Sequence, residues 1–330
     1  MNTLVLGAAG FLGLNLVDEM RAAGLEPLCA RRKRTNVIPL RSRKARMVNV
    51  DLEEPASIRE AMDGVEVVFH VAGHYPRHSQ DELAATETGL RQLENVLEAA
   101  AAAQIGRLVY VSSTATVAPS PRGLSDETDT FHTAPGFGVY HDLKWRMERR
   151  ARAERRFEVR VACPGACIGP WDLRVGTSAL VVAAARRIDV FHPDGIVAVV
   201  DAADAARGIL RQGILPHAPD RVLLVGGNYR LQALRATLSG RYGGPAPSPP
   251  IGAAEARALS DAEERRALRE GGRAALSREI VDLVIHGVPI DASLATTALG
   301  LTWSPLADTL DRFDAWARRM RIIPNLENVA

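Results

Sequence analysis

The chain has 330 residues, of which 47% are hydrophobic and 24% are charged, and its formal net charge is +2. This length allows one large or two modest domains with a buried core, and the composition is ordinary for a globular protein. The charge balance gives no reason to expect nucleic acid as a partner, and no apolar run approaches the roughly 20 residues that span a membrane.

A glycine-rich turn follows the first predicted strand. Residues 2–7 are typical of a short buried strand, and residues 12–23 of an amphipathic helix that ends at Gly24. A turn of this kind lets the backbone approach a pyrophosphate at the N-terminus of the helix. The pattern predicts a dinucleotide site made by Gly7, Gly10, Phe11, Leu12 and Gly13.

The second predicted strand, residues 26–30, ends in four consecutive basic residues, 31–34. A site specific for NAD would carry Asp or Glu here to bind the ribose 2′-hydroxyl. We therefore expect Arg31 and Arg32 to bind a 2′-phosphate, which makes NADP(H) the predicted cofactor and NAD(H) the less favoured one. The alternative is a solvated basic loop.

Two further strands, residues 46–50 and 65–71, continue the pattern. Asp51 and Leu52 follow the first of these strands, where we expect a wall for the adenine. Small residues at the end of the second strand would let the backbone lie along the cofactor, as predicted for Val71, Ala72 and Gly73.

Three histidines, His70, His74 and His78, recur at a spacing of four residues and raise the question of a metal site. Gly73 and Pro76 interrupt any continuous helix there, so the imidazoles should not share a face. No metal site is predicted.

Hydroxyl side chains follow the fifth predicted strand. A long helix, residues 80–103, precedes this strand at 107–111, which runs into Ser112, Ser113 and Thr114. Ligands of open α/β sheets bind at the carboxyl ends of the strands. The alternative is that these hydroxyls satisfy backbone groups in a turn.

Tyr140 and Lys144 open a helix predicted to run to about residue 155. Side chains four residues apart lie on one face of a helix, and an ammonium beside a phenol lowers the pKa of the phenol. Such a tyrosine can donate or accept a proton near neutral pH. The alternative is a half-buried aromatic ring packed on a lysine stem.

The rest of the chain completes an α/β pattern. A sixth strand at 158–162 precedes Cys163 and Cys167, which we interpret as core residues; the sparse cysteines favour reduced thiols and a cytoplasmic location. The alternation predicts a doubly wound parallel sheet, the Rossmann fold, with a smaller, mostly helical C-terminal domain. Residues 1–170 and parts of 188–230 should bind NADP, and residues 171–187 and 231–330 should form a substrate or lid domain.

Together these motifs resemble the extended short-chain dehydrogenase/reductases of the NAD-dependent epimerase/dehydratase superfamily. The similarity is greatest to the branch of dihydroflavonol reductases, hydroxysteroid dehydrogenases and hopanoid-associated epimerases. The resemblance rests on the glycine turn, Asp51-Leu52, the His70–Gly73 segment, Ser112–Thr114, the Tyr140/Lys144 pair and the Pro164–Pro170 segment. It covers roughly residues 1–230.

The resemblance implies a role for each motif. Tyr140 would donate or accept the proton, and Lys144 would lower the pKa of Tyr140 and hold the nicotinamide ribose. Thr114 would hydrogen-bond the substrate oxygen, with Ser113 as the alternative. The backbone around Pro164 and Ala166 would face the nicotinamide.

Two family features are absent. The long helix has Gly89 in the region where the family often has asparagine, and the segment 163–167 lacks the asparagine typical of nucleotide-sugar enzymes. These departures bear on the choice of reaction.

Three functions compete. The first is NADP(H)-dependent reduction of a ketone or aldehyde, or oxidation of the alcohol, on a small to mid-sized, largely apolar substrate. The second is a nucleotide-sugar epimerase or dehydratase with tightly bound NAD, and the third a dinucleotide sensor. The intact Tyr140/Lys144 pair and the missing asparagine favour the first. His74, Tyr75 and Trp171 are expected to contact the substrate. The sequence leaves open whether the protein forms a homodimer.

Overall fold

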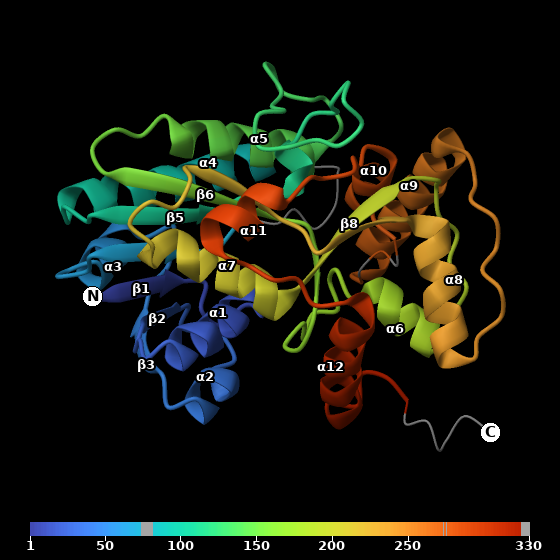
Figure 1. The fold of residues 1–330 in the computed structure, drawn as a ribbon, viewed down its shortest axis with the longest axis horizontal. Coiled ribbons are helices and arrows are strands. Elements are labelled where there is room, and N and C mark those ends of the chain that lie inside the picture. Colours follow the sequence, from blue (N-terminus) through green and yellow to red (C-terminus); the bar gives the residue numbers. More distant parts are fainter. Residues whose placement is uncertain (74–81, 273, 275, 325–330) are drawn as a thin grey trace.

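The computed structural model describes residues 1–73, 82–272, 274 and 276–324. Its main feature is a seven-stranded parallel sheet in the order β3-β2-β1-β4-β5-β6-β9 (Figure 1). The strands are β1 (Thr3–Leu6), β2 (Leu28–Arg31), β3 (Arg46–Asn49), β4 (Val67–His70), β5 (Arg107–Val111), β6 (Glu158–Pro164) and β9 (Arg221–Leu224). This architecture confirms the predicted Rossmann fold.

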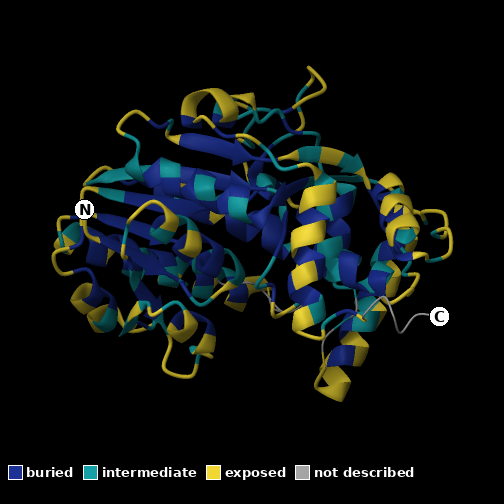
Figure 2. Ribbon diagram, turned by 60° about the horizontal axis from the view of Figure 1, so that its bottom comes forward, coloured by how far each residue is buried: buried dark blue, intermediate teal, exposed yellow. Residues whose placement is uncertain are grey.

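Helices cover both faces of this sheet because its central strands are apolar on both sides. In β1, Leu4 and Leu6 join the core on one face and Val5 joins the core on the other. The first face packs against α3 (Pro55–Ala61), α4 (Glu82–Ala102) and α5 (Val139–Arg152). The second face packs against α1 (Phe11–Ala22), α2 (Ile38–Ser42), α7 (Ala202–Ile214) and α11 (Ser293–Leu299). The buried sheet between partly exposed helices is visible in Figure 2.

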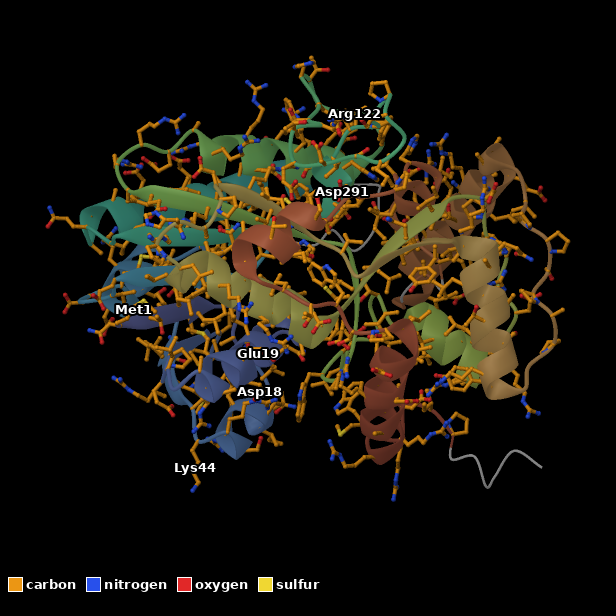
Figure 3. All side chains as sticks on the ribbon, viewed as in Figure 1. Met1, Asp18, Glu19, Lys44, Arg122 and Asp291 are labelled. Atoms are coloured by element: carbon orange, nitrogen blue, oxygen red, sulfur yellow. The ribbon has the colours of Figure 1, made fainter. Side chains whose placement is uncertain are left out.

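Ion pairs tie α1 to its neighbours on the second face. Asp18 accepts hydrogen bonds from Arg43, which follows α2, with oxygen–nitrogen distances of 2.6 Å. Glu19 pairs with Arg207 of α7 at 3.0 Å. Asp18 and Glu19 therefore fix the helix that begins at the glycine turn (Figure 3).

The smaller part of the molecule combines a three-stranded sheet with helices. Its strands, in the order β10-β8-β7, are β7 (Ala166–Ile168), β8 (Ile196–Asp201) and β10 (Gly227–Arg230). Its helices are α6 (Ala179–Ala185), α8 (Leu231–Tyr242), α9 (Ala253–Glu270), α10 (Arg278–Ile285) and α12 (Leu306–Arg319). Residues of α6, α8 and α12, including Leu238, Phe313 and Trp316, form a separate core with Val199 of β8.

The chain passes between the two sheets at Gly165. The Gly165 amide donates to the carbonyl of Leu224 in the large sheet at 3.1 Å, and the next residue begins β7. A Cβ atom at residue 165 would lie 2.4 Å from the carbonyl oxygen of Ala198. Only glycine permits this approach without displacement of β8.

Three short elements, α2, β7 and β10, were not expected from the sequence, and α5 ends at Arg152 rather than near residue 155.

The cysteines are free and buried, and burial raises the pKa of Cys163 and Cys167 to about 12. Their interpretation as core residues is confirmed. Among the described residues, no helix combines the length and apolar character that a membrane span requires.

Candidate active site

The glycine turn joins the end of β1 to α1 as expected. The Gly10 amide donates to the Gly7 carbonyl at 2.9 Å, and Gly10 lies at the N-cap of α1 without any side-chain cap. The first amides of α1, at Phe11, Leu12 and Gly13, are therefore available to an anion. A Cβ atom at residue 13 would lie 2.2 Å from the Gly7 oxygen, so this tight turn requires glycine.

The turn lies at the point where the strand order reverses, between β1 and β4. The amides of Val71 and Ala72 both donate to the Leu6 carbonyl, at 3.0 and 2.8 Å. A Cβ atom at Gly7, whose φ is +90°, would lie 2.6 Å from the Ala72 nitrogen. This close approach of two backbones, with exposed Gly10 and Gly73 beside it, fits a dinucleotide at the switch point of the sheet.

The basic segment follows β2 at the same edge. Arg31 is partly buried, and its Nη1 makes long hydrogen bonds to the carbonyls of Arg32 and Lys33, at 3.5 and 3.4 Å. Arg32 is exposed, and within the described part of the chain its guanidinium has no carboxylate partner. Its charge is therefore accessible to a ligand.

Asp51 and Leu52 follow β3 and are partly buried. The Asp51 carboxylate accepts a hydrogen bond from the Glu53 amide at 3.1 Å, and the Leu52 carbonyl accepts one from Asn95 of α4 at 2.8 Å. Both residues are thus fixed beside the carboxyl ends of β2 and β3.

The hydroxyl residues after β5 divide between two positions. Thr114 begins a short 3₁₀ helix, η2 (Thr114–Thr116), and Ser113 caps it by accepting a hydrogen bond from the Ala115 amide at 3.2 Å. Ser113 is also hydrogen-bonded to the side chain of Tyr140. This contact favours Ser113, the alternative in the sequence prediction, over Thr114 as the hydroxyl next to the phenol.

Tyr140 lies in the first turn of α5, whose N-cap is Gly138 with a φ of +119°. Burial raises the pKa of Tyr140, and the hydrogen bond from Ser113 opposes this shift in part. The sequence predicted a pKa lowered by Lys144, and this prediction is wrong. Desolvation is the largest effect on this pKa and holds it above the ordinary value of a phenol, so Tyr140 keeps its proton at neutral pH.

Lys144 is buried one turn further along α5. Its Nζ donates to the Val111 carbonyl at 3.3 Å and lies 5.8 Å from the centre of the Tyr110 ring. A Cβ atom at Gly73 would lie 3.8 Å from this nitrogen, so Lys144 reaches the end of β4. Burial lowers the pKa of Lys144 to about 8, which leaves it mostly charged at pH 7.

The other predicted contacts are distributed more widely. Pro164 ends β6 and Ala166 begins β7, on either side of the passage between the sheets. The Trp171 ring is covered by the Arg43 guanidinium at 4.2 Å and lies 6.3 Å from the Trp316 ring. Trp171 therefore contacts α12 and the end of α2. His74, Tyr75 and His78 lie outside the described residues, and His70 is buried in the core.

Sequence reasoning missed an aromatic cluster next to Tyr140. Phe137 stacks on His286, which follows α10, with ring centres 3.7 Å apart and planes 2° apart. Phe131 and His141 each contact the edge or face of Phe137, with ring centres at 5.7 Å. Nothing local in the sequence links residues 137 and 286, because tertiary packing alone brings them together.

Glu148 was also missed, although its spacing gave a signal. It lies four residues beyond Lys144 and eight beyond Tyr140, on the same face of α5. Its carboxylate is buried and accepts hydrogen bonds from Ser112 and Thr116, each at 2.6 Å.

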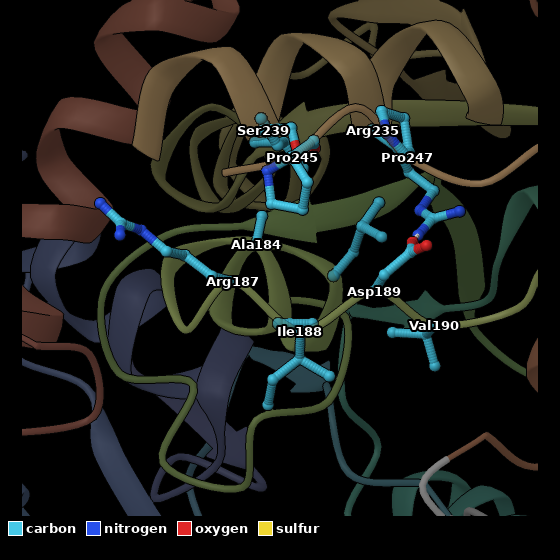
Figure 4. Close-up of a pocket in the computed structure, with 12 residues that line it drawn as sticks. Ala184, Arg187, Ile188, Asp189, Val190, Arg235, Ser239, Pro245 and Pro247 are labelled. Atoms are coloured by element: carbon cyan, nitrogen blue, oxygen red, sulfur yellow. Dashed lines mark hydrogen bonds and ion pairs between the residues drawn. The ribbon is translucent and has the colours of Figure 1, made fainter. Parts of the chain in front are cut away.

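A cavity of about 20 Å³ lies elsewhere, between α6 and α8 (Figure 4). Its wall includes Arg235 and Asp189, which form an ion pair, together with Leu180, Ser239 and Pro247. This volume holds about one water molecule. None of the predicted site residues lines it.

Comparisons with known proteins identify the family of this chain. The family model described as the NAD dependent epimerase/dehydratase family matches residues 3–211. A candidate dihydroflavonol 4-reductase of Synechocystis sp. is 27% identical over 316 residues, 93% of this chain and 91% of its own. Cinnamoyl-CoA reductase 1 of Oryza sativa subsp. japonica is 28% identical and covers 67% of this chain and 70% of its own.

A solved structure of similar fold is named as an epimerase. The nucleoside-diphosphate-sugar epimerase PA4631 of Pseudomonas aeruginosa is 25% identical, with a TM-score of 0.80, over 98% of this chain and 99% of its own. Reductases and epimerases thus occur among the similar proteins, as the resemblance in the sequence implied. By its fold, its glycine turn and its family match, the chain belongs to the NAD dependent epimerase/dehydratase family.

Proposed function

We propose that this protein is an NADP(H)-dependent reductase of a ketone or aldehyde, or a dehydrogenase of the corresponding alcohol. The observation that carries the proposal is the hydrogen bond between Ser113 and the protonated phenol of Tyr140. Together these hydroxyls can bind a substrate oxygen, and Tyr140 can give it a proton. The nicotinamide, when bound, supplies or accepts the hydride.

The other residues prepare this site. Lys144 is held by the Val111 carbonyl near Gly73, where its charge is available to a cofactor ribose. The amides at the start of α1 would hold the pyrophosphate, with Asp51 and Leu52 at the adenine end and Pro164 to Ala166 along the nicotinamide.

Support for NADP(H) comes from the end of β2. Arg32 is exposed there, and the segment has no acid that would bind a 2′-hydroxyl. A guanidinium binds phosphate through charge-assisted hydrogen bonds. The family name mentions NAD, so cofactor choice rests on these side chains.

Support for a largely apolar substrate comes from the aromatic cluster beside Tyr140. Phe131, Phe137, His141 and His286 pack together where α10 meets the start of α5. Burial lowers the pKa of His141 to about 4, so this imidazole is neutral at pH 7. A wall of neutral rings suits an apolar substrate with one polar carbonyl.

The alternative function, a nucleotide-sugar epimerase or dehydratase with tightly bound NAD, is favoured by the name of PA4631. The reductase is preferred because two relatives that match two thirds or more of this chain carry reductase names. The missing asparagine at 163–167 points the same way.

Substitutions in the hydroxyl pair test the proposal. Tyr140→Phe removes the proton and keeps the ring, so NADPH-dependent carbonyl reduction should fall by about two to four orders of magnitude. Ser113→Ala should be more damaging than Thr114→Ala, because Ser113 contacts the phenol. Steady-state rates and NADPH fluorescence titrations measure both effects. Full turnover by Tyr140→Phe would refute the mechanism, and a larger loss in Thr114→Ala would return the substrate contact to Thr114.

A further inference from the structure

The strongest unassigned feature near the proposed site is the buried ion pair between Glu148 and Arg221. Glu148 lies on α5 and is 4% exposed, and Arg221 begins β9 and is 5% exposed. The Arg221 Nε donates to the Glu148 Oε1 at 2.7 Å. Buried ion pairs add little net stability compared with apolar residues of the same size. The presence of this pair is therefore better explained by how it positions its neighbours or by its charges.

The second carboxylate oxygen of Glu148 holds the turn that follows β5. Its Oε2 accepts hydrogen bonds from Ser112 Oγ and Thr116 Oγ1, both at 2.6 Å. Arg221 reinforces the contact, because its Nη2 donates to Thr116 Oγ1 at 3.0 Å. Ser112 and Thr116 enclose Ser113 and Thr114, so both ends of the hydroxyl turn are bound to α5.

This arrangement matters because the two proposed reacting hydroxyls lie on separate elements. Tyr140 belongs to α5, whereas Ser113 lies in the turn after β5. Their relative position depends on bonds that cross between these elements, and a displacement of about 1 Å at such a site can cost 100-fold in rate. Glu148 supplies two of those bonds.

The same carboxylate acts on Lys144 through its charge. Burial lowers the pKa of Lys144, and electrostatic interactions with Cys163 and with Glu148, one helical turn away, oppose that shift. Burial leaves Cys163 as a neutral thiol at pH 7. The negative charge that acts on Lys144 at this pH therefore belongs to Glu148.

We propose that Glu148 and Arg221 are positioning residues for the proposed active site. The pair holds the turn from Ser112 to Thr116 against α5 so that Ser113 meets Tyr140. This inference rests on the proposed roles of Tyr140, Ser113 and Lys144.

The test compares Glu148→Gln with Glu154→Gln. Glu154 is also buried, two residues beyond the end of α5, but its carboxylate accepts hydrogen bonds from the Arg156 side chain and from the amides of Arg155 and Arg156 rather than from the hydroxyl turn. Both variants lose one buried carboxylate charge. Only Glu148→Gln should lower kcat, by about tenfold or more, with the KM for NADPH within about threefold of wild type.

A second readout needs neither substrate nor cofactor. The Lys144 ammonium is titrated by NMR after ¹³C reductive methylation, with Lys144→Arg to assign its signal. Its titration should move to lower pH in Glu148→Gln and stay unchanged in Glu154→Gln. The proposal is wrong if Glu148→Gln melts at a lower temperature yet keeps the wild-type kcat and Lys144 titration, since the pair is then only structural.

Two further variants cover the case in which Glu148→Gln does not fold. Ser112→Ala removes one donor to Glu148 without leaving a buried charge unpaired, and should reduce kcat about threefold or more. Glu148→Gln combined with Arg221→Gln leaves a neutral pair and should still shift the Lys144 titration. The proposal is overturned if the variants that fold have the wild-type kcat and the wild-type Lys144 titration. The Lys144 titration does not depend on turnover, so it tests the role of Glu148 and Arg221 by itself. Full activity in Tyr140→Phe would instead refute the proposed function.

Discussion

At the scale of single residues, burial decides the protonation of the proposed catalytic groups. Burial raises the pKa of Tyr140 and lowers that of Lys144 only to about 8, so both groups still carry their protons at pH 7. A protonated phenol is suited to donate to a substrate oxygen, which is the direction of carbonyl reduction. Spacing alone predicted the pair but not this state, because desolvation depends on the whole surrounding structure.

The choice between Ser113 and Thr114 shows the same limit. Adjacent hydroxyls are equivalent in a sequence pattern, and their separation here follows from the backbone of η2. Ser113 caps the 3₁₀ helix and reaches Tyr140, whereas Thr114 begins it and is partly exposed.

Arg32 carries the prediction about the cofactor. Removal of its charge-assisted phosphate contact in Arg32→Ala should weaken NADPH binding by roughly 1.5–3 kcal/mol and leave NADH binding nearly unchanged. Arg34→Ala, an equal charge change in the same exposed loop, is the matched control and should have a small effect. Fluorescence titrations at two salt concentrations measure these affinities, and the contribution of Arg32 should shrink at high salt. Equal losses for both cofactors would show that Arg32 does not bind the 2′-phosphate.

At the scale of elements, apolar runs bounded by glycine or polar residues predicted most of the structure. The strand at Arg107–Val111 has the bounds that the sequence indicated. The strands β7 and β10 were missed because each is defined by pairing with residues of β8 that lie more than 25 positions away along the chain. The segment Gly-Asn-Tyr-Arg of β10 has no apolar alternation of its own.

The contact between α9 and α10 gives a prediction about pH. Glu279 and Glu264 are 3% and 1% exposed, and burial, with a smaller effect of the Glu264 charge, raises the pKa of Glu279 to about 7. A raised folded pKa contributes stability that is present below the unfolded pKa of about 4.5 and is lost as the pH rises through about 7.

We expect the free energy of unfolding to fall by about 2 kcal/mol between pH 5 and pH 8 through this group. Glu279→Gln should remove that part of the pH dependence, as measured by urea denaturation across this range. Glu270→Gln, at an exposed position on α9, should retain it. An identical slope for wild type and Glu279→Gln would contradict a protonated Glu279 in the folded protein.

At the scale of the whole molecule, the proposed site lies along one edge of the large sheet. The glycine turn, Arg32, Ala72 and Ser113 follow the carboxyl ends of its strands, and Pro164 is the last residue of β6. The fold could be predicted because each of these motifs follows a recognisable strand. The aromatic cluster beside Tyr140 could not be predicted, because its His286–Phe137 stack joins residues that are far apart in the chain.

The central claim is a net transfer of hydride between NADPH and a carbonyl substrate. The direct measurement incubates the protein with NADPH deuterated at C4, as each of the two epimers, and with a panel of apolar ketones and aldehydes, followed by mass spectrometry of the products. We predict one deuterium per alcohol from one epimer, one NADP⁺ per product, and loss of both in Tyr140→Phe. Contradiction would be protein that retains bound NAD, transfers no deuterium to any carbonyl and converts UDP-glucose without net oxidation of NADPH.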